Sequence, residues 1–73
     1  MTLSNIRPGE MIEILSIPDE NVRVQAIRLG IYEGAQIQCT EKVSAGPIIL
    51  KRRMQEIAIG HGLAEQIKVK IIA

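Results

Sequence analysis

The chain has 73 residues and a formal net charge of +1, with one cysteine, one Tyr and no Phe or Trp. Such a length supports one small domain, whose core has to be aliphatic because aromatic side chains are nearly absent. The single cysteine excludes an internal disulfide, and the small net charge argues against a nucleic-acid-binding protein, which needs a concentrated basic surface.

The first predicted element is a strand. Leu3 and Ile6 lead into a Pro-Gly turn, and we expect both side chains to be anchored in the core. Residues 10–17 are mostly apolar and partly β-branched, which favours a strand over a helix for so short a run. Pro18 then ends this strand.

A short amphipathic helix is expected next, and Asp19 is placed to cap its first turn. Apolar residues recur there at helical spacing: Val22, Ala26 and Leu29, with Ile27 beside them. Gly30 stands where a helix end requires a left-handed backbone conformation, which costs glycine least. Ile31 follows as the apolar residue that commonly packs back on the last turn.

After Gly34 the pattern changes to period two, which predicts a strand. Its inward side chains are expected to be Ala35, Ile37, Cys39 and Val43. Three further strands and one helical turn follow: strands over 48–53, 56–59 and 67–71, and the turn over 63–66, with Ile67, Val69 and Ile71 inward. The sequence therefore predicts a mainly β fold, a small and partly open five-stranded barrel with one helix after the first strand.

Residues capable of catalysis are scarce. His61 is the only imidazole, and its position between two glycines favours a solvated turn residue; a ligand role shared with carboxylates of another copy stays open. Cys39 falls on the apolar face of its strand, which favours a small buried side chain over a reactive thiol. We therefore predict no catalytic residue, no metal ligand set, no cofactor and no enzymatic activity.

The only charge run is Lys51-Arg52-Arg53. Because strand side chains alternate, Lys51 and Arg53 are expected on one face and Arg52 on the other. This pattern favours a solvated strand edge over a phosphate-binding cluster.

Several short segments occur in a fixed order along the chain. They are Pro8-Gly9-Glu10, Ile27-Arg28-Leu29-Gly30 with Glu33-Gly34, Gly46-Pro47-Ile48, and Glu56-Ile57-Ala58-Ile59-Gly60 with Leu63-Ala64-Glu65. The set resembles the ferrous iron transport protein A (FeoA) family over nearly the entire chain. One departure is Gly60-His61-Gly62, which fills a place where family members often carry basic residues, so a contact made there by arginine is not expected here.

The resemblance implies a single SH3-like barrel domain over residues 1–73. It also implies a cytoplasmic accessory protein that binds FeoB, the membrane transporter of ferrous iron with a GTP-hydrolysing domain, and it brings no catalytic residues. The absence of a run of about 20 apolar residues and of a secretory pattern at the start agrees with a cytoplasmic location.

For the partner-binding surface we predict Arg28, Ile31 and Tyr32, since arginine and tyrosine are frequent among the residues that dominate interface energies. Ile31 and Tyr32 are a bulky pair in a connection; either they are exposed as a docking point or they pack over an open end of the barrel. The alternative function is a regulatory sensor that responds to a divalent metal. A nucleic-acid-binding barrel using Lys51 and Arg53 is disfavoured, and the edge strands make a homodimer an open expectation.

Overall fold

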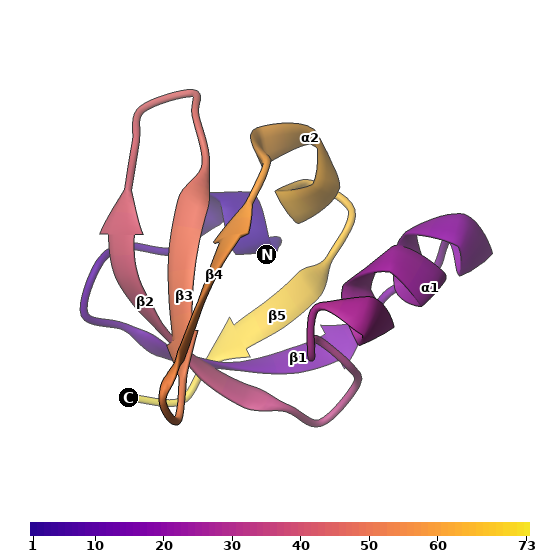
Figure 1. The fold of residues 1–73 in the computed structure, drawn as a ribbon, viewed down its shortest axis with the longest axis horizontal. Helices are drawn as coiled ribbons and strands as arrows, with labels where there is room; N and C mark the ends of the chain where they lie inside the picture. The colour runs from indigo at the N-terminus through magenta and orange to yellow at the C-terminus, as the bar shows by residue number, and fades with distance from the viewer.

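Five antiparallel strands form one curved sheet in the computed structural model, which describes residues 1–73 (Figure 1). The elements in chain order are the 3-10 helix η1 (Leu3–Asn5), β1 (Met11–Ser16), α1 (Glu20–Arg28), β2 (Gln36–Lys42), β3 (Ile48–Arg52), β4 (Gln55–Ile59), α2 (His61–Ala64) and β5 (Lys68–Ile71). None of the three helices has the length and apolar content needed to cross a membrane.

The strand order is β4-β3-β2-β1-β5, so β4 and β5 are the edges of the sheet. The sheet curls around its apolar face, and no ladder joins the two edges (Figure 1). This arrangement confirms the mainly β, SH3-like fold and its open character. It also confirms the helix after the first strand and the helical turn before the last, although α2 begins at His61, two residues earlier than expected.

The core consists of 18 buried residues, and none of them is charged or strongly polar. Cross-strand pairs place aliphatic side chains opposite each other, as in Ile12 with Ile37 and Ile48 with Ile59. Leu3 and Ile6 are fully buried, as the sequence predicts. Because the largest core side chains are Ile and Leu, the interior is narrow and depends on the register of the strands.

Two residues expected to point inward are exposed. Val43 lies in the turn after β2, where its side chain is 49% exposed, because the register shifts between Cys39 and Glu41 and the strand ends at Lys42. A β-bulge of this kind interrupts the alternation on which the prediction relied. Ile71 is also exposed, at the end of the edge strand β5.

Both hairpin turns contain a non-glycine residue in the left-handed conformation. Ala45, between β2 and β3, has φ of 56°, and Arg53, between β3 and β4, has φ of 58°. For residues with a Cβ this conformation costs about 1–2 kcal/mol relative to a right-handed one. Because Arg53 is in this conformation, β3 ends at Arg52, one residue before the end of the run Lys51-Arg52-Arg53.

Candidate functional site

Helix α1 and the connection after it are held by the two caps that the sequence predicts. At the start, Oδ1 of Asp19 accepts a hydrogen bond of 3.0 Å from the backbone N–H of Val22. At the end, Gly30 has φ of 83°, the left-handed conformation expected of it. These two signals are local, so they are readable without knowledge of the fold.

The hydrogen bonds at the helix end form a Schellman motif. The N–H of Gly30 donates to the carbonyl of Ile27 at 3.0 Å, and the N–H of Ile31 donates to that of Ala26 at 2.9 Å. This motif is usually accompanied by an apolar contact between the residue after the glycine and the last helical turn. It thus turns the chain so that Ile31 enters the core.

Ile31 is 0% exposed, so its prediction as part of a docking surface is wrong. Of the two alternatives for the pair, packing into the barrel holds for Ile31 and exposure holds for Tyr32, whose side chain is 41% exposed. The difference follows from the turn, which aims consecutive side chains in different directions. Arg28, in the last turn of α1, is exposed as expected.

Tyr32 is fixed in place by Arg52 of β3. The guanidinium carbon of Arg52 lies 4.8 Å from the centre of the Tyr32 ring, and Nη2 donates a hydrogen bond to the Tyr32 hydroxyl. In addition, Nη1 of Arg52 donates to the carbonyl of Gly30 at 3.3 Å. One arginine therefore attaches the connection after α1 to a strand 20 residues further along the chain.

Helix α1 leaves apolar side chains in solvent. Only Val22 and Ala26 of the helix are buried, and Figure 1 shows α1 standing out to one side of the sheet. Ile27, expected on the packed side, is 54% exposed, and Val24 is exposed as well. Positions 24, 27 and 28 lie on one side of a helix, so Val24, Ile27 and Arg28 form one surface, which we call the α1 face.

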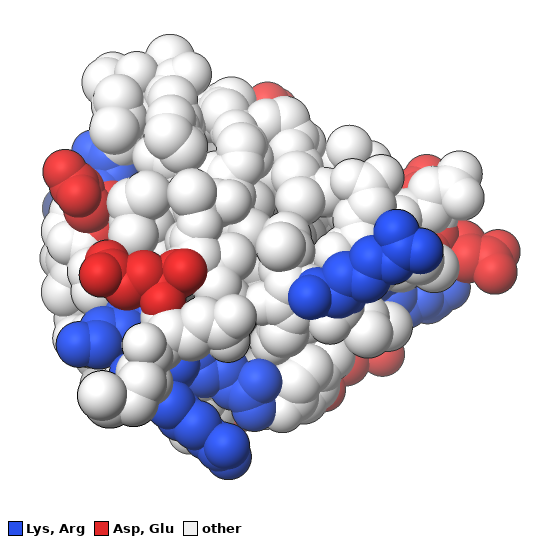
Figure 2. Space-filling model, viewed as in Figure 1, with Lys and Arg blue, Asp and Glu red and all other residues white.

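The charge run Lys51-Arg52-Arg53 lines part of a hollow of about 470 Å³, which Tyr32 in the connection after α1 also lines. Its polar lining comes from Tyr32, Gln36, Gln38, Lys51, Arg52 and Arg53. Lys51 and Arg53 are exposed and Arg52 is half-buried, in agreement with the predicted alternation, and all three side chains nevertheless line the same hollow. Figure 2 shows Lys and Arg side chains gathered at this lower end of the molecule.

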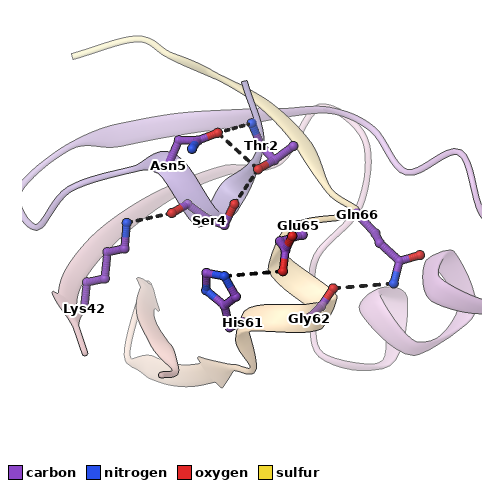
Figure 3. A network of polar contacts seen from close by, with 8 residues as sticks. All are labelled: Thr2, Ser4, Asn5, Lys42, His61, Gly62, Glu65 and Gln66. Carbon is purple, nitrogen blue, oxygen red and sulfur yellow. Dashed lines mark hydrogen bonds and ion pairs between the residues drawn. The ribbon is translucent and has the colours of Figure 1, made fainter. Parts of the chain in front are cut away.

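The opposite end of the sheet holds a second polar cluster (Figure 3). Nζ of Lys42 donates to the carbonyl of Ser4 at 2.6 Å, which links β2 to η1. His61 opens α2 and pairs through Nε2 with Oε1 of Glu65 at 3.3 Å, so it is a half-buried helix residue and not the solvated turn residue expected. Its Nδ1 is buried without a hydrogen-bond partner.

Cys39 is fully buried on the inner face of β2, which agrees with the prediction of a packed side chain. Burial raises the pKa of its thiol, an effect only partly opposed by the Glu41 backbone and the charge of Lys42. The neutral thiol is a weak nucleophile, and the core shields it. No three His, Cys, Asp or Glu side chains lie together as a metal ion would require.

Comparison with known proteins gives one consistent family. A family model described as the FeoA domain matches residues 1–71. The chain is similar to the crystal structure of an iron uptake regulatory protein (FeoA), with 33% identity, a TM-score of 0.88, and coverage of 99% of this chain and 100% of that one.

Two solution structures are also similar. A FeoA-like protein from Clostridium acetobutylicum has 21% identity and a TM-score of 0.86, with 100% of this chain and 87% of that chain covered. The FeoA protein from Chlorobium tepidum has 28% identity and a TM-score of 0.83, with 100% of this chain and 71% of that chain covered. No curated protein matches the chain.

Proposed function

We propose that this chain, which belongs to the FeoA domain family, acts as a non-enzymatic accessory protein of ferrous iron uptake that binds the cytoplasmic part of the transporter FeoB. The observation that carries the proposal is the family match over residues 1–71, together with 33% identity to an iron uptake regulatory protein of nearly the same fold. The partner itself is what membership of this family implies.

The surface that best suits such binding is the α1 face. It combines two exposed apolar side chains, Val24 and Ile27, with the guanidinium of Arg28. Exposed apolar side chains that cluster on one helix of a small domain are typical of interaction sites. Of the residues predicted from sequence, Arg28 belongs to this face, Tyr32 lies beyond the helix cap, and Ile31 is replaced by Ile27.

Binding to the immobilised cytoplasmic part of FeoB tests the proposal. The Ile27→Ser variant removes apolar area from the α1 face, so its dissociation constant should rise at least tenfold, a typical effect for a central interface residue. The Arg28→Ala variant should weaken binding as well. Both side chains are exposed, and the fold should be unchanged by circular dichroism.

Val43→Ser is the matched control, because Val43 is an aliphatic residue of similar exposure in the β2–β3 turn. Its binding should equal that of the unmodified chain. If the unmodified chain fails to bind, the partner is wrong. If it binds and the Ile27 variant binds equally well, the partner stands and the α1 face is wrong.

A further inference from the structure

The hollow beside the β3–β4 turn is lined by two cations, Lys51 and Arg53, that form no ion pair within the chain. Lys51 and Arg53 are exposed, and the only close contact between a basic side chain and a carboxylate is that of His61 with Glu65 at the other end. The cross-strand neighbour of Lys51 is Glu56, yet the two form no ion pair. Two such cations in the lining of a hollow of about 470 Å³ make it complementary to carboxylates or phosphates.

Arg52 gives this hollow a rigid wall. Its hydrogen bonds to the Tyr32 hydroxyl and the Gly30 carbonyl use its guanidinium within the fold. The side chain is therefore a fixed support, and Lys51 and Arg53 are left as the groups that can meet a ligand. A wall whose rotamers are already fixed reduces the ordering cost of binding.

The floor of the hollow carries amide groups suited to a peptide. Gln36 and Gln38 project from the exposed face of β2, where neither side chain has a hydrogen-bond partner within the protein. Residues two apart on a strand are separated by about 6.6 Å, the same repeat that an extended peptide has along its own backbone. Each amide offers both a donor and an acceptor, as a peptide backbone does. Gln38 also lies directly across from Lys51 in the β2–β3 ladder, so amide and cation are adjacent.

A second hollow lies beside the first at the β3–β4 turn. It has a volume of about 430 Å³ and is lined by Arg52, Arg53, Met54 and Gln55. Met54 is 98% exposed at the tip of the turn, where its flexible thioether can contact an apolar side chain of a ligand. The two hollows share Arg52 and Arg53 in their lining, so they adjoin each other at the β3–β4 turn.

Nucleic acid suits this surface less well. Tyr32 is the only Phe, Tyr or Trp residue of the chain, and the guanidinium of Arg52 covers one face of its ring, so the chain has no row of aromatic side chains on which successive bases could stack. The net charge of +1 gives little of the long-range attraction that a polyphosphate needs. Two free cations flanked by neutral amides match a short segment with a few carboxylates.

We propose that the two adjoining hollows together bind an extended acidic peptide segment of a partner protein. Lys51 and Arg53 would pair with its carboxylates, and Gln36 and Gln38 would bond to its backbone. The site shares no residue with the α1 face, so the proposal does not depend on the proposed function.

Fluorescence anisotropy with a labelled ten-residue peptide of alternating Glu and Ser tests the proposal. The double variant Lys51→Gln and Arg53→Gln should bind at least tenfold more weakly than the unmodified chain. Gln36→Ala with Gln38→Ala should weaken binding severalfold without changing its dependence on salt, because it removes no charge. Binding of the Glu peptide should fall as salt is raised.

The matched control is Arg7→Gln with Lys68→Gln, which removes two exposed cations that line neither hollow. Its affinity should change less than twofold. The proposal is overturned if the control weakens binding as much as the test variant, or if a peptide with Gln in place of Glu binds equally well. It is also overturned if a ten-nucleotide single strand binds more tightly than the Glu peptide.

A measurement on the unmodified chain gives an independent answer if a variant fails to fold. On titration with the Glu peptide, backbone amide signals of Gln36, Gln38 and Lys51 should shift in NMR spectra. Shifts confined to α1, or no shifts at saturating peptide, would contradict the proposed site.

Discussion

At the end of the sheet near α2, Lys42 donates to the carbonyl of Ser4 at 2.6 Å, and His61 pairs with Glu65 at 3.3 Å. At the opposite end, near the β3–β4 turn, Arg52 alone is used in this way, and the two cations beside it have no partner. Both ends thus employ one long cationic side chain to attach a distant segment. They differ in the other charged side chains: near α2, His61 and Glu65 contact each other, whereas Lys51 and Arg53 at the turn end form no ion pair.

The largest expected effect is the loss of stability on truncation of core side chains, and this loss should be similar at the two ends. Ile31 lies under the Tyr32 connection and Leu3 lies in η1 at the other end, and both are fully buried. Truncation of either to Ala removes packed methyl groups and leaves a cavity, so each variant should lose about 2–5 kcal/mol of the free energy of unfolding. Urea denaturation followed by circular dichroism measures this loss.

The exposed residue Ile27 supplies the control for this pair. Ile27→Ala should change the free energy of unfolding by less than about 0.5 kcal/mol, because a half-exposed side chain leaves no cavity. An Ile31→Ala variant as stable as Ile27→Ala would show that Ile31 is not packed in the core.

A smaller effect is expected for Arg52 and Lys42, the two cations that bond distant segments of the chain together. Arg52→Met and Lys42→Met keep much of the apolar stem but remove the donors, so each should destabilise the protein by about 1 kcal/mol, the net value of a partly exposed hydrogen bond. The two should differ in local consequences, measurable by hydrogen exchange. Arg52→Met should speed exchange in residues 30–34 and Lys42→Met in residues 3–6.

The Arg52–Tyr32 contact can be separated from the rest by a double-mutant cycle with Tyr32→Phe, which removes the hydroxyl and keeps the ring. A coupling energy near zero would contradict the attachment of the connection to β3. Arg52→Lys should restore little, since a lysine lacks the planar fork that reaches both acceptors.

The smallest effect lies between the two ends, at Cys39 in the middle of β2. Burial raises the pKa of this thiol above its ordinary value of 9.0, so the folded state favours the neutral form more than the unfolded state does. Its contribution to stability is complete below that value and is lost as the pH rises through the folded-state pKa. The free energy of unfolding should therefore fall above pH 9 in the unmodified chain, and more steeply than in Cys39→Ala. Equal slopes for the two proteins would contradict the raised pKa.

The features predicted from sequence are those encoded over a few residues. Asp19 and Gly30 indicate the two ends of α1, and the period-two pattern after Gly34 predicts β2. The five short strands with one helix after the first then predicted a partly open barrel, and the family resemblance added its SH3-like character. Ile31 illustrates how such a local signal also decides the site: the glycine that ends the helix is the reason that the next side chain is buried, so burial was already implied by the cap.

What the sequence could not predict depends on contacts between distant residues. The alternation rule separated Arg52 from its two neighbours, but nothing near Arg52 indicates that its partners are Gly30 and Tyr32. Likewise, the apolar spacing of α1 predicted that Ile27 is packed, but its side chain is exposed. Spacing identifies the apolar face of a helix and does not show how much of that face the sheet covers. The bulge in β2, which leaves Val43 exposed, has no local signal either.

At Arg53, whose backbone is left-handed, the residue that would be best for stability differs from the residue that the proposed peptide binding requires. Glycine there would relieve about 1–2 kcal/mol of strain, and it would also delete one of the two free cations. Ala45, in the other hairpin turn, carries the same strain with no charge to lose. Laboratory evolution for heat resistance alone should accordingly accept glycine at both turns, whereas evolution that also rewards peptide capture should accept it only at Ala45.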